Sequence, residues 1–266
     1  MKQRELKRFL DLKVVEYNDL SFIKDDPLGI PHRFSQQQDI EIAAFFAALL
    51  AWGNRKSIIN SCNKLLSLMG DSPYSFIMNF DYEEDSAAFY AFEKFVHRTF
   101  NKTDLWHLLG FLKHHYSTQG ETSLETAFTR CMQPGDETME NGLIGFHNYV
   151  FSYNEFASEE RHCRKHIATP AKKSACKRLN MFLRWMVRTD EQQVDFGIWK
   201  KINPAQLICP VDVHVARVAR KLKILKRPQN DWQAALELTA YLKTMDATDP
   251  VKYDYALFGL GVMEHY

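Results

Sequence analysis

Apolar residues recur along this chain at the spacing of helices, and the alternating pattern of strands is scarce. The clearest stretch, residues 39–51 (DIEIAAFFAALLA), is apolar almost all round, which predicts a central buried helix. Gly53 should end it. Residues 54–70 then predict a second helix, closed by Gly70, with apolar positions at Ile58, Ile59, Cys62, Leu65, Leu66 and Met69. A short polar corner therefore joins two helices.

Residues 86–115 predict further helices, and residues 231–245 and 250–263 predict two closing ones. In the first of these ranges, Thr103 or Asp104 should cap the helix that runs through LWHLLGFLKHH. No internal repeat interrupts this order, so we expect an all-α fold. The whole chain, residues 1–266, should form a single globular unit.

Residues 169–188 (TPAKKSACKRLNMFLRWMVR) predict another helix, because Thr169 is a preferred N-cap and Pro170 suits the first helical position. One face is apolar and should pack. The opposite stripe is basic and consists of Lys173, Lys177, Arg184 and Arg188.

Length and composition place the chain among ordinary globular proteins. With 266 residues and 45% apolar content it can bury one core, or two lobes that share one. The N-terminus is charged and the longest apolar run, residues 42–52, is too short to span a bilayer, so we expect a cytoplasmic protein without signal peptide or membrane anchor. The five cysteines form no CxxC pair and none follows Cys209, which favours reduced thiols and argues against an iron–sulfur cluster.

A net charge of +1 hides a strong asymmetry along the chain. Residues 161–230 hold 17 Lys/Arg against 4 Asp/Glu, whereas the remainder holds 17 against 29. Within that basic portion, residues 161–188 carry nine basic side chains and no acidic one. Such a distribution favours a polyanionic partner.

Asp212 is the only acidic residue between Asp195 and Asp231, and it precedes an amphipathic segment within CPVDVHVARVARKL (residues 209–222). The commoner role for such a residue is structural, since Asp is a preferred N-cap and complements the helix dipole. A cap uses one carboxylate oxygen and leaves the other for chemistry. The two roles are therefore compatible.

The segment CPVDVHVARVARKL resembles the VDxHVxRV signature of the helix-hairpin-helix DNA glycosylases, the superfamily that contains endonuclease-III-like and 8-oxoguanine glycosylases. Asp212 stands at the signature's aspartate. The stretch IATPAKKSA is similar to the family motif LPGVGxKTA and puts Lys173 at its lysine, although Thr169 and Ala171 replace the hairpin glycines. Lys173 and Asp212 are 39 residues apart, about twice the usual family spacing, so Lys177 or no lysine remain alternatives for the nucleophile.

A third match, EIAAFFAALLAWGNRKSI (residues 41–58), is similar to the family's buried helix and the polar corner that probes DNA. It implies DNA contacts from Trp52, Asn54 and Arg55. The whole chain looks still more like a bacterial family known only as a domain of unknown function and distantly linked to these glycosylases. The resemblance implies a two-lobed helical domain, a basic cleft between the lobes and a monomer that binds duplex DNA.

The implied activity is removal of a damaged base that has been flipped out of the duplex. Asp212 would stabilise the cationic sugar, and in a bifunctional enzyme a lysine amine would form a Schiff base. Neither step calls for a cofactor. Further DNA contacts are expected, on the basic portion, from Lys172, Arg178, His214 and Arg217.

Two other functions compete with this hypothesis. The missing hairpin glycines favour a noncatalytic DNA-binding protein on the same scaffold, and the basic face also fits a helical module that binds an acidic protein. Separately, His162, Cys163 and His166 in RHCRKH could form part of a metal site. No fourth ligand is evident there, so we interpret the segment as a basic surface turn and expect no metal.

Overall fold

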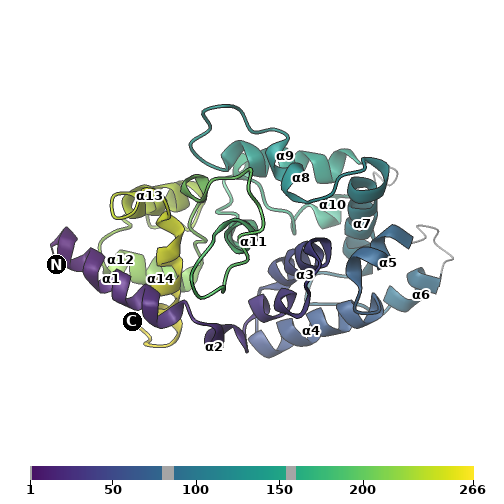
Figure 1. Cartoon of the computed structure of the whole chain (residues 1–266), viewed down its shortest axis with the longest axis horizontal. Coiled ribbons are helices and arrows are strands. Elements are labelled where there is room, and N and C mark those ends of the chain that lie inside the picture. The colour runs from purple at the N-terminus through teal and green to yellow at the C-terminus, as the bar shows by residue number, and fades with distance from the viewer. Residues whose placement is uncertain (1, 80–86, 154–159) are drawn as a thin grey trace. The chain divides into compact units, whose positions relative to one another are not determined.

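The protein is described by a computed structural model that covers residues 2–79, 87–153 and 160–266. These residues form helices and turns with isolated bridges and no β-strand, which confirms the all-α prediction (Figure 1). The chain divides into two compact units, which we describe separately. Unit 1 comprises residues 1–24, 132–143 and 169–266, and unit 2 comprises residues 25–131 and 144–168. None of the described helices is both long and apolar enough to cross a membrane.

The helix at the centre of unit 2 is α3 (Gln37–Leu50), and its side chains are buried without a break from Asp39 to Leu50. The prediction of a central buried helix is therefore confirmed. The next helix, α4 (Arg55–Leu68), packs on α3 through the apolar face that its sequence predicted, and Gly70 follows it with a positive φ of 65°. The other helices of this unit are α5 (Pro73–Asn79), α6 (Ala87–Phe92), α7 (Lys102–Lys113), α8 (Glu125–Thr129) and α10 (Glu160–Cys163). Helix α9 (Glu140–Ser152) begins in unit 1 and continues in unit 2.

A buried carboxylate joins α3 to the chain before α8. Glu41 is fully buried and accepts hydrogen bonds from the Tyr116 hydroxyl (2.8 Å), the Ser123 hydroxyl (2.6 Å) and the Leu124 backbone N–H (2.9 Å). These bonds satisfy a charge that would otherwise be costly to bury. Burial first, and then the Glu41 charge, raises the pKa of Tyr116 well above its usual value, so the phenol remains a donor.

The start of α7 differs from its prediction. Asn101, not Thr103 or Asp104, is the N-cap, and its side chain accepts from the Asp104 N–H (3.3 Å). Asp104 completes a reciprocal capping box by accepting from the Asn101 N–H (2.9 Å). Several consecutive residues here are good caps, so the sequence alone did not fix which one caps the helix.

Helix α14 (Tyr253–Val262) packs against α1 (Gln3–Tyr17) and α12 (Val213–Lys221) in unit 1 (Figure 1). Its glycines allow this close approach. A Cβ at Gly259 would overlap the Tyr17 ring, and one at Gly261 would lie 3.0 Å from His214 Cβ. The closing helices α13 (Trp232–Lys243) and α14 confirm the two predicted from the sequence. Unit 1 also contains the short helix α2 (Leu20–Ile23) and α11 (Lys177–Val187).

The predicted helix over residues 169–188 begins later than expected. Thr169 does act as a cap, but of a single 3-10 turn, Pro170–Lys172. Lys173 and Cys176 then adopt left-handed backbone conformations, with φ of 59° and 50°, and α11 starts only after them. The Lys173 carbonyl accepts instead from the Trp232 N–H (3.0 Å). A Thr-Pro start suits a 3-10 turn as well as an α-helix, so a tertiary contact decided between them.

Candidate active site around Asp212

Asp212 is the N-cap of α12, as predicted. Its Oδ1 atom accepts hydrogen bonds from the backbone N–H groups of His214 (2.8 Å) and Val215 (2.9 Å). Both of these cap bonds end on the same oxygen, so the cap leaves Oδ2 unused. Asp212 itself is only half-buried. The helix therefore fixes the carboxylate while one oxygen stays outside the cap.

A second carboxyl, Asp254 on α14, is buried close enough to Asp212 to be affected by its charge. Burial raises the pKa of Asp254 to about 6; Arg184 opposes this rise, Asp212 adds to it and Lys177 opposes it. Lys177 and Asp212 thus act on the same buried group. Asp254 was not predicted as a site residue, although an acid within an otherwise apolar helix was a usable signal.

The two candidate lysines lie in different surroundings. Lys177 is the first residue of α11 and is half-buried, with its ammonium nitrogen 3.5 Å from the Met181 sulfur. Lys173 is exposed and lies in the turn before the helix. The charge of Lys177, like that of Asp212, affects the pKa of Asp254.

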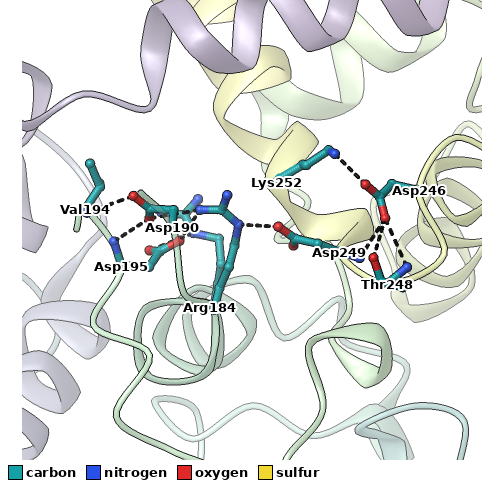
Figure 2. Close-up of polar contacts among 9 residues, drawn as sticks. Arg184, Asp190, Val194, Asp195, Asp246, Thr248, Asp249 and Lys252 are labelled. Carbon is teal, nitrogen blue, oxygen red and sulfur yellow. Dashed lines mark hydrogen bonds and ion pairs between the residues drawn. The ribbon is translucent and has the colours of Figure 1, made fainter. Parts of the chain in front are cut away.

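A buried ionic cluster lies around Arg184, Asp190, Asp195 and Asp249 (Figure 2). Arg188 donates to Asp190 (3.1 Å), Asp195 (3.0 Å) and Asp249 (2.8 Å). Arg184 pairs with Asp254 and lies 3.4 Å from Asp195.

This cluster holds four carboxylates (Asp190, Asp195, Asp249 and Asp254) and two guanidiniums. The excess of carboxylates acts in the same direction as burial, which raises the pKa of a carboxyl group. Burial raises the pKa of Asp249 despite the nearby Arg188. The prediction that Arg184 and Arg188 lie on a basic stripe opposite the packed face is wrong, because both are buried and paired with carboxylates. Two of the acids, Asp249 and Asp254, come from the C-terminal segment. The helical pattern of residues 169–188 could not predict that these distant residues pair with Arg184 and Arg188.

The other predicted DNA contacts of unit 1 differ in accessibility. Lys172 is exposed, whereas Arg178 is half-buried and burial lowers its pKa to about 10. His214 lies in the first turn of α12 and packs on Gly261. Arg217 donates to the carbonyl oxygens of Gly261 (2.6 Å) and Tyr266 (3.2 Å), so its guanidinium holds the end of α14. Their contacts with DNA remain predictions.

The three predicted DNA contacts of unit 2, Trp52, Asn54 and Arg55, lie at the corner between α3 and α4. Trp52 packs edge-on against His97 and is stacked on His166, with ring centroids 4.9 and 5.5 Å away. Asn54 caps α4 by accepting from the Ser57 N–H (3.3 Å), and Arg55 lies 3.9 Å from the Asp26 carboxylate. A shallow, open depression beside this corner is lined by Asn54, Lys56, Ser57, Asn60, Ser61 and Lys64.

A family model described as "Protein of unknown function (DUF2400)" matches residues 26–263. The chain belongs to this family. The matched range includes every candidate residue from Trp52 to Arg217, so the Asp212 site lies within the DUF2400 region. A search of curated proteins and a search of solved structures each gave no match.

Proposed function

We propose that this DUF2400 protein is a DNA glycosylase that excises a damaged base, with Asp212 as its catalytic carboxylate. The observation that carries the proposal is the cap of α12, which fixes Asp212 through Oδ1 alone within a VDxHVxRV-like segment. As a base leaves, the sugar gains positive charge at its anomeric carbon. A fixed carboxylate oxygen next to that carbon lowers the energy of the cationic transition state.

Lys177 is the proposed nucleophile if the enzyme also cleaves the strand. Its amine would attack the anomeric carbon, the base would leave with the electron pair of the glycosidic bond, and opening of the sugar ring would give a Schiff base. Support comes from its position at the start of α11 and from its effect on Asp254, which Asp212 shares. Lys173 is the alternative that the motif alignment favours.

A noncatalytic DNA-binding protein is the second candidate. The observation that favours it is the turn before α11, where Thr169 and Ala171 replace the hairpin glycines and the left-handed positions fall on Lys173 and Cys176. A different turn would bind the DNA backbone differently. On this hypothesis the exposed lysines bind phosphate and Asp212 serves only as a cap.

Borohydride trapping and base release on labelled duplexes distinguish these functions. The duplexes contain oxidised purines, oxidised pyrimidines or abasic sites, and the proteins are the wild type, Asp212→Asn, Lys173→Gln and Lys177→Gln. Asn is as good an N-cap as Asp, so Asp212→Asn should stay folded while it loses the charge. We expect base release that disappears in Asp212→Asn.

The lysine variants then separate the two types of glycosylase. A covalent adduct that is lost only in Lys177→Gln identifies that residue as the nucleophile, and release without an adduct indicates a monofunctional enzyme. If no duplex releases a base, while DNA binding is salt-dependent and unchanged in Asp212→Asn, the noncatalytic function is the correct one.

A further inference from the structure

A cluster of one carboxylate and two histidines lies in unit 2, where α10 meets the first turn of α7. Asp104 Oδ1 is 2.7 Å from His162 Nδ1, and Asp104 Oδ2 is 3.3 Å from His166 Nε2. All three potential ligand atoms lie within 4.8 Å of one another. From the sequence, the segment with these two histidines was interpreted as a basic surface turn, and Asp104, 58 residues from His162, gave no sign of joining them.

We propose that Asp104, His162 and His166 bind one divalent transition-metal ion, with Zn²⁺ the best match to the donors. Two imidazole nitrogens and a carboxylate oxygen form a common protein ligand set for zinc with an open coordination position. Bond lengths of about 2.0–2.2 Å in a tetrahedral site place ligand atoms about 3.3 Å apart. The distance to His166 already has that value, and His162 would have to move outward from 2.7 Å.

The surroundings hold two of the three ligands in place and leave the third adjustable. Asp104 is fully buried and accepts from the Asn101 N–H (2.9 Å). Burial would raise the pKa of Asp104, but the His166, Asn101 and His162 hydrogen bonds outweigh it and hold the pKa below its usual value. His166 is buried between the rings of Trp52 and Phe100, whose centroids are 5.5 and 5.0 Å away. Preorganised ligands of this kind are typical of metal sites.

His162 provides the solvent-facing side of the site. Its side chain is 42% exposed, so an ion can enter there and a water molecule can complete the coordination. Lys165 Nζ lies 2.7 Å from His162 Nε2, and because an ammonium can only donate, this contact assigns the acceptor role to Nε2. An ion bound through Nδ1 would require the neutral imidazole to carry its proton on Nε2, which it would reach by exchange with solvent. Lys165, which has no acceptor to offer, must then move away.

The first experiment is a metal titration of the full chain after dialysis against a chelator. We expect one Co²⁺ per chain with the intense visible bands of tetrahedral coordination, displaced by Zn²⁺. His162→Ala should weaken binding by at least about tenfold, since even outer-shell changes have effects of that size. His265→Ala removes an exposed histidine from unit 1 and serves as the matched control. It should bind like the wild type.

A second measurement locates the ion without a substitution. Zinc should protect His162, and not His265, from acylation by diethyl pyrocarbonate, as read by mass spectrometry of the modified peptides. Because this measurement uses only the wild-type protein, it tests whether His162 binds the ion even if His162→Ala folds poorly. The proposal is overturned if the wild type binds no ion, if His162→Ala binds as tightly as the wild type, or if saturating zinc leaves His162 equally reactive.

Discussion

Arg184 on α11 and Asp254 on α14 form an ion pair whose side chains are only 8% and 7% exposed. Despite this partner, burial raises the pKa of Asp254 from 3.8 to about 6, and the charge of Asp212 adds to the effect. The protonated form of Asp254 is therefore favoured by folding. Its contribution to stability is fully present below about pH 4 and is lost as the pH rises through about 6.

Asp254→Asn removes this titration and tests it. The wild-type free energy of unfolding, relative to that of the variant, should fall by about 3 kcal/mol between about pH 4 and pH 7, because one pKa unit corresponds to about 1.4 kcal/mol. Urea denaturation over this pH range measures the difference. A difference that does not change with pH would show that Asp254 has no raised pKa in the folded protein.

Arg188 connects three carboxylates within the same cluster, so its loss should be severe. Arg188→Ala leaves Asp195 buried without its strongest partner and should lower the free energy of unfolding by about 3–5 kcal/mol. Arg188→Lys keeps the charge but cannot donate along the same directions, and should cost less. Chemical denaturation of both variants provides the measurement. A cost below about 1 kcal/mol for Arg188→Ala would mean that the cluster behaves like a surface ion pair.

The sequence predicted those parts of the fold that depend on local pattern. Helix α3 was recognisable because its residues are apolar on every side, and the Asp212 cap because an isolated acid precedes an amphipathic segment. The start of α11 could not be recognised from the sequence, because Thr169 and Pro170 suit a 3-10 turn as well as an α-helix. The hydrogen bond from the Trp232 N–H to the Lys173 carbonyl is a long-range contact that no local pattern predicts.

The candidate sites follow the same division. Asp212 could be identified from a short motif, whereas Asp254 and Asp104 join their sites only through tertiary contacts with distant segments. Asp254 is the single carboxylate in the apolar sequence of α14, and only its ion pair with Arg184 in the structure explains why it lies in a core helix. Side chains that converge from separate helices leave no spacing rule in one sequence.

The contact between Gly259 and Tyr17 gives a prediction about packing. Gly259→Ala would place a methyl group within the Tyr17 ring, and overpacking of this kind costs about 1–3 kcal/mol even though alanine favours the helix. Thermal or urea denaturation measures the loss. In a Tyr17→Ala background the same substitution should cost much less, because the ring is gone. Equal costs in both backgrounds would assign the effect to something other than this contact.

Two substitutions at Asp212, the N-cap of α12, test whether its contribution to stability comes from the cap hydrogen bonds or from the negative charge. Asp212→Ala removes the acceptor of the His214 and Val215 N–H groups and should lower the free energy of unfolding by about 1 kcal/mol. Asp212→Asn retains an acceptor oxygen and should differ little from the wild type. Urea denaturation of the two variants provides the comparison. If Asn destabilises as much as Ala, the charge contributes more to the fold than the cap geometry indicates.

The exposed lysines of the turn before α11 give a prediction about DNA binding that does not depend on catalysis. Each lysine that neutralises a phosphate releases a counterion, so the slope of log affinity against log salt falls by about 1 for each contact removed. Lys172→Gln and Lys173→Gln should each reduce the slope by about that amount, and the double variant by about twice as much. Affinities for an undamaged duplex at several salt concentrations provide the slopes.

Lys24 is another exposed lysine of unit 1 and lies outside this turn. Lys24→Gln is therefore the matched control and should leave the slope unchanged. An equal fall in Lys24→Gln would mean that DNA responds to the overall charge of the protein and not to this turn. Unchanged slopes in the Lys172 and Lys173 variants, together with equal binding of other polyanions, would instead favour a basic face that meets an acidic protein. The salt dependence thus tests the DNA partner separately from Asp212, whose removal should affect base release and leave these slopes as they are.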